Sequence, residues 1–200
     1  KEESQGRYVR DVERGVIENI SEYPWQTDTS IGDWYYREGQ KYMTSDEVIQ
    51  MLVDIVSKNG NLLLNVVQTP EGDLENDVLQ ILEGIASWIK DNGEAIYGTR
   101  PWTVYGEGPS TTGKQEKGWF EGLKDVRKYQ STDIRFTQKQ GMLYAFCMEH
   151  PTSDIQIHAL NGKKVASVRM LGNKEKMKWS QSEEELTIKL PATMPNYSAI

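Results

Sequence analysis

The chain has 200 residues, of which 37% are hydrophobic and 26% charged, a composition typical of a globular protein with one or two domains. Its net charge of −7 and pI near 5.0 argue against nucleic acid and anionic membrane surfaces as partners. The apolar runs are much shorter than the roughly 20 residues of a membrane-spanning helix, and the single cysteine permits no disulfide within the chain.

The first quarter of the chain predicts a loop, a strand and then a helix. Residues 1–22 are charged and irregular, so we expect a loop with about one helical turn. Residues 25–31 alternate weakly and favour β-formers, which predicts a strand. Thr44 and Glu47 form a capping-box pattern before apolar residues at helical spacing, and Asn59-Gly60 is typical of a helix end. The pattern therefore predicts a helix from Thr44 to Asn59.

A second strand and helix follow in the same order. Residues 62–67 are apolar without alternation, as expected of a parallel strand that is buried on both faces. An amphipathic pattern then predicts a helix over residues 77–92. Strands that alternate with helices indicate a parallel α/β arrangement, with long loops after the carboxyl ends of the strands. In a (β/α)₈ barrel such loops build the active site.

The pattern changes near residue 100, where short strand candidates begin to alternate with turns. Antiparallel strands at this spacing favour a β-sandwich, and Asn161-Gly162 is typical of a type I′ hairpin turn. We therefore predict an α/β domain over residues 1–100 and an all-β domain over residues 101–200. The predicted strands are 133–137, 141–148, 154–159, 163–170, 175–180 and 184–190.

Three segments carry a resemblance to a known family. They are PWQTDTSIGDWYY from Pro24, NGNLLLNVVQTPEGDL from Asn59 and NGEAIYGTRPW from Asn92. In this order they resemble the C-terminal third of the catalytic barrel of α-L-fucosidases of glycoside hydrolase family 29. The resemblance implies the last strands and helices of a (β/α)₈-like barrel, followed by an antiparallel β-sandwich domain.

The same resemblance implies a retaining exo-α-L-fucosidase, which removes terminal α-linked L-fucose by double displacement and needs no cofactor or metal. The expected partners are a fucosylated glycan and an N-terminal barrel segment that precedes Lys1. A periplasmic or secreted location follows from this substrate class. In the family the nucleophile is an Asp on the fourth barrel strand, which we expect upstream of Lys1. This chain alone is therefore expected to be inactive.

The acid/base is expected before the seventh barrel strand. In one subgroup of the family it is a Glu directly after the Trp that opens this strand, but here Gln26 holds that position and cannot donate a proton as an acid. Glu13, within YVRDVERG, best matches the other family pattern. Glu18 and Glu22 are rivals, with Glu3 further behind. A solvated loop carboxylate is the alternative role of Glu13.

The expected substrate-binding residues follow or flank the same strand. Trp34 is the first candidate, because an exposed indole packs on the apolar face of a sugar and on the C6 methyl of fucose. A structural role between loop and barrel is its alternative. Asp28 and Asp33 are expected either to bind a hydroxyl or to fix the loop. Asn65, inside an apolar run, is expected as a hydrogen-bonded support.

Two other functions stay open at this point. A carbohydrate-binding or interaction module without catalysis is favoured by the missing nucleophile and by Trp119 and Trp179 in the β-domain. Two barrel-like β–α units would have no purpose in a lone binding module, which argues against it. An unrelated α/β plus β protein would have to match three motifs in order by chance.

Overall fold

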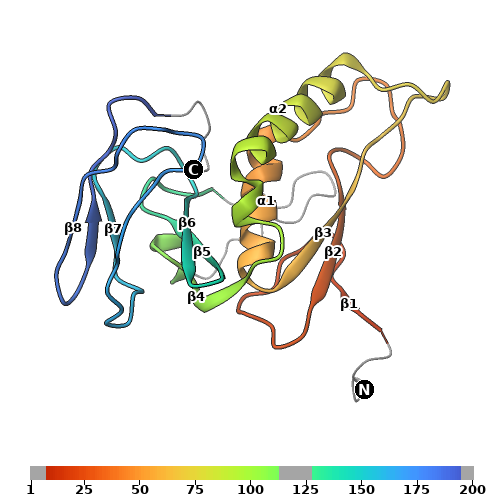
Figure 1. The fold of residues 1–200 in the computed structure, drawn as a ribbon. Helices are drawn as coiled ribbons and strands as arrows, with labels where there is room; N and C mark the ends of the chain where they lie inside the picture. Colours follow the sequence, from red (N-terminus) through yellow and green to blue (C-terminus); the bar gives the residue numbers. More distant parts are fainter. Residues whose placement is uncertain (1–7, 113–127, 195–200) are drawn as a thin grey trace. The chain divides into compact units, whose positions relative to one another are not determined.

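The computed structural model describes residues 8–112 and 128–194, which form two compact units (Figure 1). The first unit extends to Ala86 and the second begins at Ser87, so the division falls inside helix α2 (Asn76–Asn92). The domain boundary between residues 100 and 101 stays a prediction. Glu3 and Trp119 lie outside the described residues.

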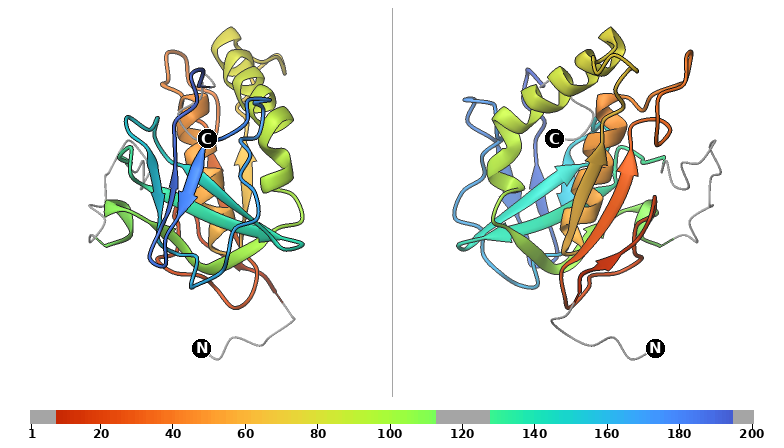
Figure 2. Two further views of the ribbon diagram at one scale, coloured as in Figure 1. Left: turned by 60° about the vertical axis from the view of Figure 1, so that its left-hand side comes forward. Right: turned by 90° about the vertical axis from the view of Figure 1, so that its right-hand side faces the viewer.

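The sheet of the first unit has three parallel strands in the order β1-β2-β3 (Figure 2). They are β1 (Arg10–Asp11), β2 (Trp25–Ser30) and β3 (Gly60–Asn65). The predicted strands of this region are confirmed, but the prediction of a loop with a helical turn before residue 22 is wrong at β1. A strand of two residues is too short to show any periodicity, so only the pairing with β2 reveals it.

Helix α1 (Ser45–Ser57) confirms the capping-box prediction. The Glu47 N–H donates to Thr44 Oγ1 at 3.2 Å, and the Thr44 N–H donates to the Glu47 carboxylate at 2.7 Å. After the helix, Asn59 adopts a left-handed φ of 71°, which turns the chain into β3. Local capping chemistry therefore sets both ends of this helix.

One face of the sheet packs on the helices and the other is polar. Leu62 and Leu64 of β3 join a core with α1 and the first half of α2, whose buried members are Ile31, Met43, Val48 and Val78. Leu63 points away from this core and is 56% exposed, so the expected burial of this strand on both faces is not seen within the described residues. The register places Leu63 beside Asp28, and Asn61 beside Gln26, on the polar face.

The second unit holds two antiparallel sheets. Their orders are β4-β5-β6 and β7-β9-β8, and one hydrophobic core contains side chains from both, including Phe136 and Ile188. This arrangement is consistent with the predicted β-sandwich. The strands are β4 (Arg100–Glu107), β5 (Ile134–Lys139), β6 (Met142–Cys147), β7 (Ile155–Ile157), β8 (Trp179–Gln181) and β9 (Leu186–Ile188), with two 3₁₀ turns, η1 (Gly93–Ala95) and η2 (Pro109–Thr111).

Two sequence predictions fail in this unit. No strand was predicted at β4, because Pro101 and Gly106 are poor strand residues; β4 tolerates them as an edge strand with an irregular register. The strand predicted over residues 163–170 is absent, although the turn before it is present. Asn161 and Gly162 both have positive φ, at 52° and 73°. The Lys163 N–H donates to Leu160 O, and this hydrogen bond closes the turn. The local turn signal was right, but it does not join two paired strands.

Cys147, at the end of β6, is buried, and its burial raises the pKa of the thiol to about 12.

Across residues 8–112 and 128–194, no helix combines the length and the apolar character needed to cross a membrane.

The close packing of Gly60 against Trp25 gives a stability prediction. A Cβ at Gly60 would lie 2.5 Å from the Trp25 ring and 2.7 Å from Ile55, and the ring is fixed by its Nε1 donating to Lys58 O at 3.0 Å. We expect Gly60→Ala to destabilise the full-length protein by about 1–3 kcal/mol through overpacking. Thermal and denaturant unfolding measure this. Asn61→Ala, at the exposed next position, should stay within about 0.5 kcal/mol of wild type, and equal losses in both variants would contradict the packing argument.

Candidate functional site

The carboxyl ends of all three parallel strands lie at one edge of the first sheet. Backbone hydrogen bonds continue the pairing beyond the strands, from Val12 N–H to Gln26 O and from Arg14 N–H to Asp28 O, both at 2.9 Å. On the other side of β2, the Ile31 N–H donates to Asn65 O at 3.2 Å. The segments that follow β1, β2 and β3 therefore begin side by side, as the loops of a parallel α/β active site do.

A tight turn after β1 presents Glu13 at this edge. The Gly15 N–H donates to Val12 O at 3.4 Å, and Thr27 Oγ1 donates to Gly15 O at 2.5 Å, so the turn is tied to β2. Arg14 within the turn has a left-handed φ of 48°. Glu13 is exposed, as a group that exchanges protons with a ligand requires. Glu13 thus lies on the turn after β1, and its role as the acid/base stays a prediction.

A cluster of acidic side chains surrounds Asp28 on β2. Burial raises the pKa of the Asp28 carboxyl, and a hydrogen bond to Asp11 and the negative charges of Asp11 and Glu13 raise it further. Asp28 Oδ1 is buried and has no hydrogen-bond partner among the described residues. Asp28 is therefore favoured as a protonated acid relative to an isolated carboxyl, with one oxygen left for a ligand.

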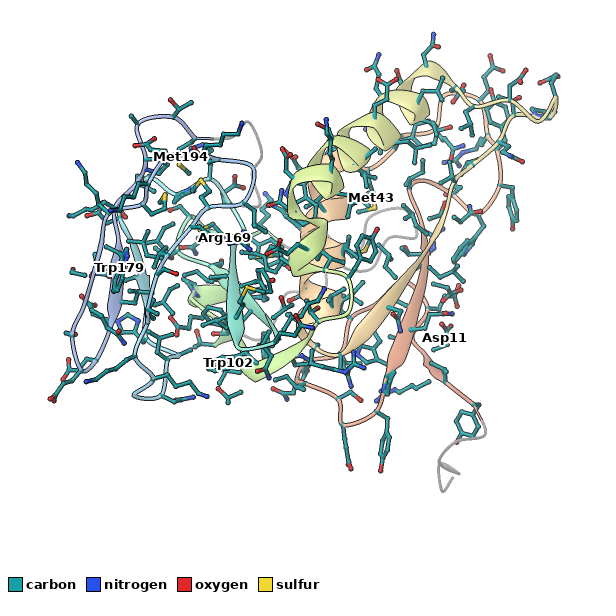
Figure 3. The ribbon with its side chains drawn as sticks, in the orientation of Figure 1. Asp11, Met43, Trp102, Arg169, Trp179 and Met194 are labelled. Atoms are coloured by element: carbon teal, nitrogen blue, oxygen red, sulfur yellow. The ribbon has the colours of Figure 1, made fainter. Side chains whose placement is uncertain are left out.

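Gln26 belongs to the same cluster. Its Nε2 donates to Asp11 Oδ1 at 3.0 Å, and Asp11 is labelled on β1 in Figure 3. This amide cannot supply a proton as an acid, but it holds the carboxylate that in turn contacts Asp28. Asp11 was not singled out from the sequence, because only the register of β1 against β2 places it beside Gln26.

Trp34 lies at the same edge and is fixed from two sides. The Asn65 amide donates to Trp34 O at 3.4 Å and to Ser30 Oγ at 3.0 Å. The Arg14 guanidinium stacks over the indole with its Cζ 4.5 Å from the ring centroid. Asn65 is therefore a hydrogen-bonded support, as its position in an apolar run predicted. Arg14 was missed, because no spacing in the sequence connects the turn after β1 with the loop after β2.

The loop over residues 31–43 is closed and internally bonded. At its base, the Met43 N–H donates to Ile31 O at 2.7 Å. Glu75 accepts hydrogen bonds from Tyr42 at 2.7 Å and from Tyr36 at 3.3 Å. These hydrogen bonds thus tie the base of the loop that carries Trp34 to β2 and its tyrosines to Glu75.

Asp33 takes part in this loop through both backbone and side chain. Its N–H donates to Gln40 Oε1 at 2.9 Å, and its carboxylate pairs with Arg37 at 2.9 Å. Ser30 Oγ donates to Asp33 O at 2.7 Å. These contacts match the loop-fixing role that was left open for Asp33.

The rival glutamates are placed differently from Glu13. Glu18 is exposed in the crossover between β1 and β2. Glu22 lies near the opposite edge, where the Asn59 amide donates to its carbonyl at 3.5 Å and the neighbouring Ser21 N–H donates to Lys58 O. Glu22 is thus separated from the carboxyl ends of the strands by the length of β2.

The second unit holds a cleft of about 830 Å³ between residues of β4, β7 and the segments around them. His158 lies at its rim, 3.5 Å from Glu107 and 3.4 Å from Glu185. No Trp, Tyr or Phe is among the described residues that line this cleft, so those residues offer no aromatic platform for a sugar. Trp179, labelled in Figure 3, is partly buried against the core of this unit. Neither feature favours a carbohydrate-binding module.

Among the described residues, no cluster of three or more His, Cys, Asp or Glu side chains could hold a metal ion.

Comparisons with known proteins agree across both units. The family model described as alpha-L-fucosidase matches residues 1–94, and the model of the alpha-L-fucosidase C-terminal domain matches residues 127–199. The tissue alpha-L-fucosidase of Mus musculus is 26% identical over 197 residues, which cover 95% of this chain and 39% of that protein. The chain thus spans less than two fifths of this relative's length.

Solved structures give the same result. The Thermotoga maritima alpha-fucosidase, crystallised in complex with fucose, is 28% identical with a TM-score of 0.65, over 88% of this chain and 38% of that one. The alpha-L-fucosidase isoenzyme 1 from Paenibacillus thiaminolyticus is 25% identical with a TM-score of 0.71, over 94% of this chain and 42% of that one.

The contacts of Tyr42 give a pH-dependent prediction. Burial, followed by the hydrogen bond to Glu75 and the charge of Glu75, raises the pKa of Tyr42 to about 12 from the ordinary value of 10.0. The folded state therefore keeps a proton that the unfolded chain loses first. This contribution to stability is complete below pH 10 and is lost as the pH rises toward 12. Glu75→Gln removes the charge, so the pKa should fall and the loss of stability over this range should shrink.

Ultraviolet absorbance titration of the full-length protein measures this tyrosine, with Tyr42→Phe as the reference that lacks it. An unchanged titration in Glu75→Gln would show that the carboxylate does not act on Tyr42.

Proposed function

Because the chain belongs to the α-L-fucosidase family, we propose that it forms part of a retaining exo-α-L-fucosidase that removes terminal α-linked L-fucose from glycans. The observation that carries this proposal is the shared edge of the parallel sheet. There, an exposed glutamate, a hydrogen-bonded pair of carboxyl groups and an aromatic ring lie on β1, on β2 and on the segments that follow these two strands. This combination is suited to sugar binding and to proton transfer at a glycosidic oxygen. We further propose that the three strands and their helices are the last part of a (β/α)₈-like barrel.

The proposed reaction is a double displacement. A carboxylate of an Asp in a part of the full-length protein outside these 200 residues attacks the anomeric carbon, while Glu13 protonates the departing glycosidic oxygen. Glu13 then takes a proton from water, which attacks the fucosyl–enzyme intermediate and releases fucose with the original anomeric configuration. The exposed position of Glu13 on the turn after β1 supports this role. On this proposal, the 200 residues by themselves are inactive.

Trp34, Asp28 and Asp33 supply the proposed binding contacts. The half-buried indole of Trp34 offers an apolar surface to the sugar ring and to the C6 methyl. Asp28 offers Oδ1, which lacks a hydrogen-bond partner within the described part of the chain, to a sugar hydroxyl. Asp33 orients the loop through Arg37, and its carboxylate is the less available of the two.

The proposed partners are a fucosylated glycan substrate and the N-terminal barrel segment of the same protein. No cofactor enters this chemistry, because both steps use only carboxyl groups and water. A periplasmic or secreted location is proposed from the substrate class.

The assignment of Glu13 is tested with the full-length protein and 4-nitrophenyl α-L-fucoside. We expect Glu13→Gln to lower hydrolysis by about 10²–10⁴-fold, because water attack on the intermediate then lacks its base. Azide, which needs no base, should restore turnover and yield a fucosyl azide. Glu18→Gln and Glu22→Gln are matched controls that remove the same charge from the neighbouring loop. Loss of activity with azide rescue in either control would move the role to that residue, and an inert wild type would reject the fucosidase proposal.

The role of Trp34 is tested with two substrates that differ by one methyl group. 4-Nitrophenyl β-D-arabinopyranoside has the ring hydroxyls of the α-L-fucoside but lacks its C6 methyl. We expect Trp34→Ala to lower kcat/KM for the fucoside by roughly tenfold or more, and for the arabinoside by several-fold less, because a buried methyl contributes about 0.8 kcal/mol. Equal losses on both substrates would assign Trp34 a structural role in the loop.

A further inference from the structure

We propose that Asn161 is a site of spontaneous deamidation, and that the fold protects the other two Asn-Gly pairs of these 200 residues from the same reaction. The three pairs begin at Asn59, Asn92 and Asn161. Asparagine is among the residues least stable to heat, and a following glycine hinders approach to its side chain least, because glycine has no Cβ. Asn161 belongs to the second unit, so this site is independent of the proposed function.

The reaction needs only the chain itself and water. The backbone nitrogen of Gly162 forms a bond to Cγ of Asn161 and loses its proton, while the side-chain nitrogen leaves as ammonia. The product is a five-membered succinimide ring, which water opens at either carbonyl. One opening gives aspartate, and the other gives isoaspartate, in which the backbone runs through the former side chain. Both products carry a carboxyl group that is ionised at neutral pH.

The turn at Asn161 is exposed, and its nucleophile is unprotected. Asn161 and Gly162 are both exposed, and the Gly162 N–H has no hydrogen-bond partner within residues 8–112 and 128–194. The turn closes through the Lys163 N–H, which donates to Leu160 O at 3.0 Å. It lies between β7 and β8 and joins no paired strands, so opening it breaks no ladder of strand hydrogen bonds.

The side chain of Asn161 is held by one exposed contact. Its amide donates to Thr103 Oγ1 at 2.8 Å, and water competes for such a bond at the surface. We expect the reaction to occur in brief openings, in which the side chain leaves Thr103 and its Cγ meets the Gly162 nitrogen. The population of such openings depends on their free energy, which is lowest in exposed turns with few contacts.

Asn59 is protected by the first parallel sheet. Its amide donates to Ser21 O at 3.1 Å, and the next residue, Gly60, is buried and pairs with Trp25 at the start of β3. A Cβ on Gly60 would lie only 2.5 Å from the Trp25 ring, so the backbone here is closely packed. Freeing the Gly60 nitrogen therefore requires β3 to separate from its neighbours.

Asn92 is protected by the end of α2. It is 5% exposed, and its amide donates to Trp88 O at 3.0 Å. Gly93 is also buried, and its carbonyl accepts hydrogen bonds from the N–H groups of Ile96 and Tyr97 at 3.1 and 2.8 Å. Reaction at this pair therefore requires the last turn of α2 and the 3₁₀ turn η1 to unwind together.

Deamidation at Asn161 changes the turn itself. A carboxylate has no N–H to donate to Thr103, and isoaspartate adds one backbone carbon between Leu160 and Lys163, whose hydrogen bond closes the turn. Leu160 is 7% exposed and belongs to the hydrophobic core of the second unit. The altered turn therefore loosens a residue of that core.

The test follows all three pairs in one sample of the full-length protein. The protein is incubated at mildly alkaline pH and digested, and the deamidated fraction of each peptide is measured by mass spectrometry. We expect Asn161 to react at least about tenfold faster than Asn59 and Asn92. In urea the three rates should lie within a few-fold of each other, because each asparagine then precedes an equally accessible glycine. Similar rates in the folded protein, or faster reaction at Asn59 or Asn92, would overturn the proposal.

Asn161→Gln is the matched variant, because glutamine would have to form a six-membered ring, which is far slower. Glutamine fits such a turn, since Gln140 has a φ of 50° before Gly141 in the β5–β6 hairpin. After the same incubation, wild type should unfold at a temperature a few degrees lower than before, and Asn161→Gln should not. An equal fall in both proteins would overturn the assignment of this loss to Asn161. Neither readout uses enzymatic activity.

Discussion

The hydrogen bonds that extend the parallel ladder beyond β1 and β2 are the constraint on which the candidate site depends. Two of them, from Val12 to Gln26 and from Arg14 to Asp28, prevent the turn after β1 from leaving the sheet. Because β1 and β2 are parallel, each further residue after β1 that pairs with β2 brings another side chain toward the carboxyl ends of the strands. This register places Asp11 and Glu13 beside Asp28. It also brings the Arg14 guanidinium to the Trp34 indole.

The site combines rigid support with polar atoms that are left unsatisfied. The loop of Trp34 is bonded at its base and by Glu75, so the ring does not have to be ordered when a ligand binds. In contrast, Arg14 Nη1 and Asp28 Oδ1 are buried without hydrogen-bond partners among residues 8–112 and 128–194, and each such group costs on the order of 1–3 kcal/mol. A ligand that meets both atoms recovers this cost.

The sequence predicted the elements whose signals are local. The limits of α1 follow from Thr44 and Asn59, and both positions carry chemistry that acts within one turn of the helix. β1 and β4 were missed, because a two-residue strand and an edge strand with Pro101 depend on their partners. At the candidate site, Glu13 was singled out by family resemblance and stays a prediction, whereas the contact of Arg14 with Trp34 was not foreseen, since Trp34 belongs to a different loop. Contacts between loops depend on strand register, which one sequence does not show.

The thiol of Cys147 is a chemical probe of the second unit, because its reaction depends on the local opening of that unit. It is the single cysteine of the 200 residues, and it is buried at the end of β6, where burial holds its pKa near 12. Thiol reagents attack the thiolate, and its population in the closed sheet at neutral pH is negligible. Alkylation of Cys147 therefore proceeds through molecules in which β6 has opened. Its rate, as in hydrogen exchange, reports the free energy of that local opening, independently of any activity at the candidate site.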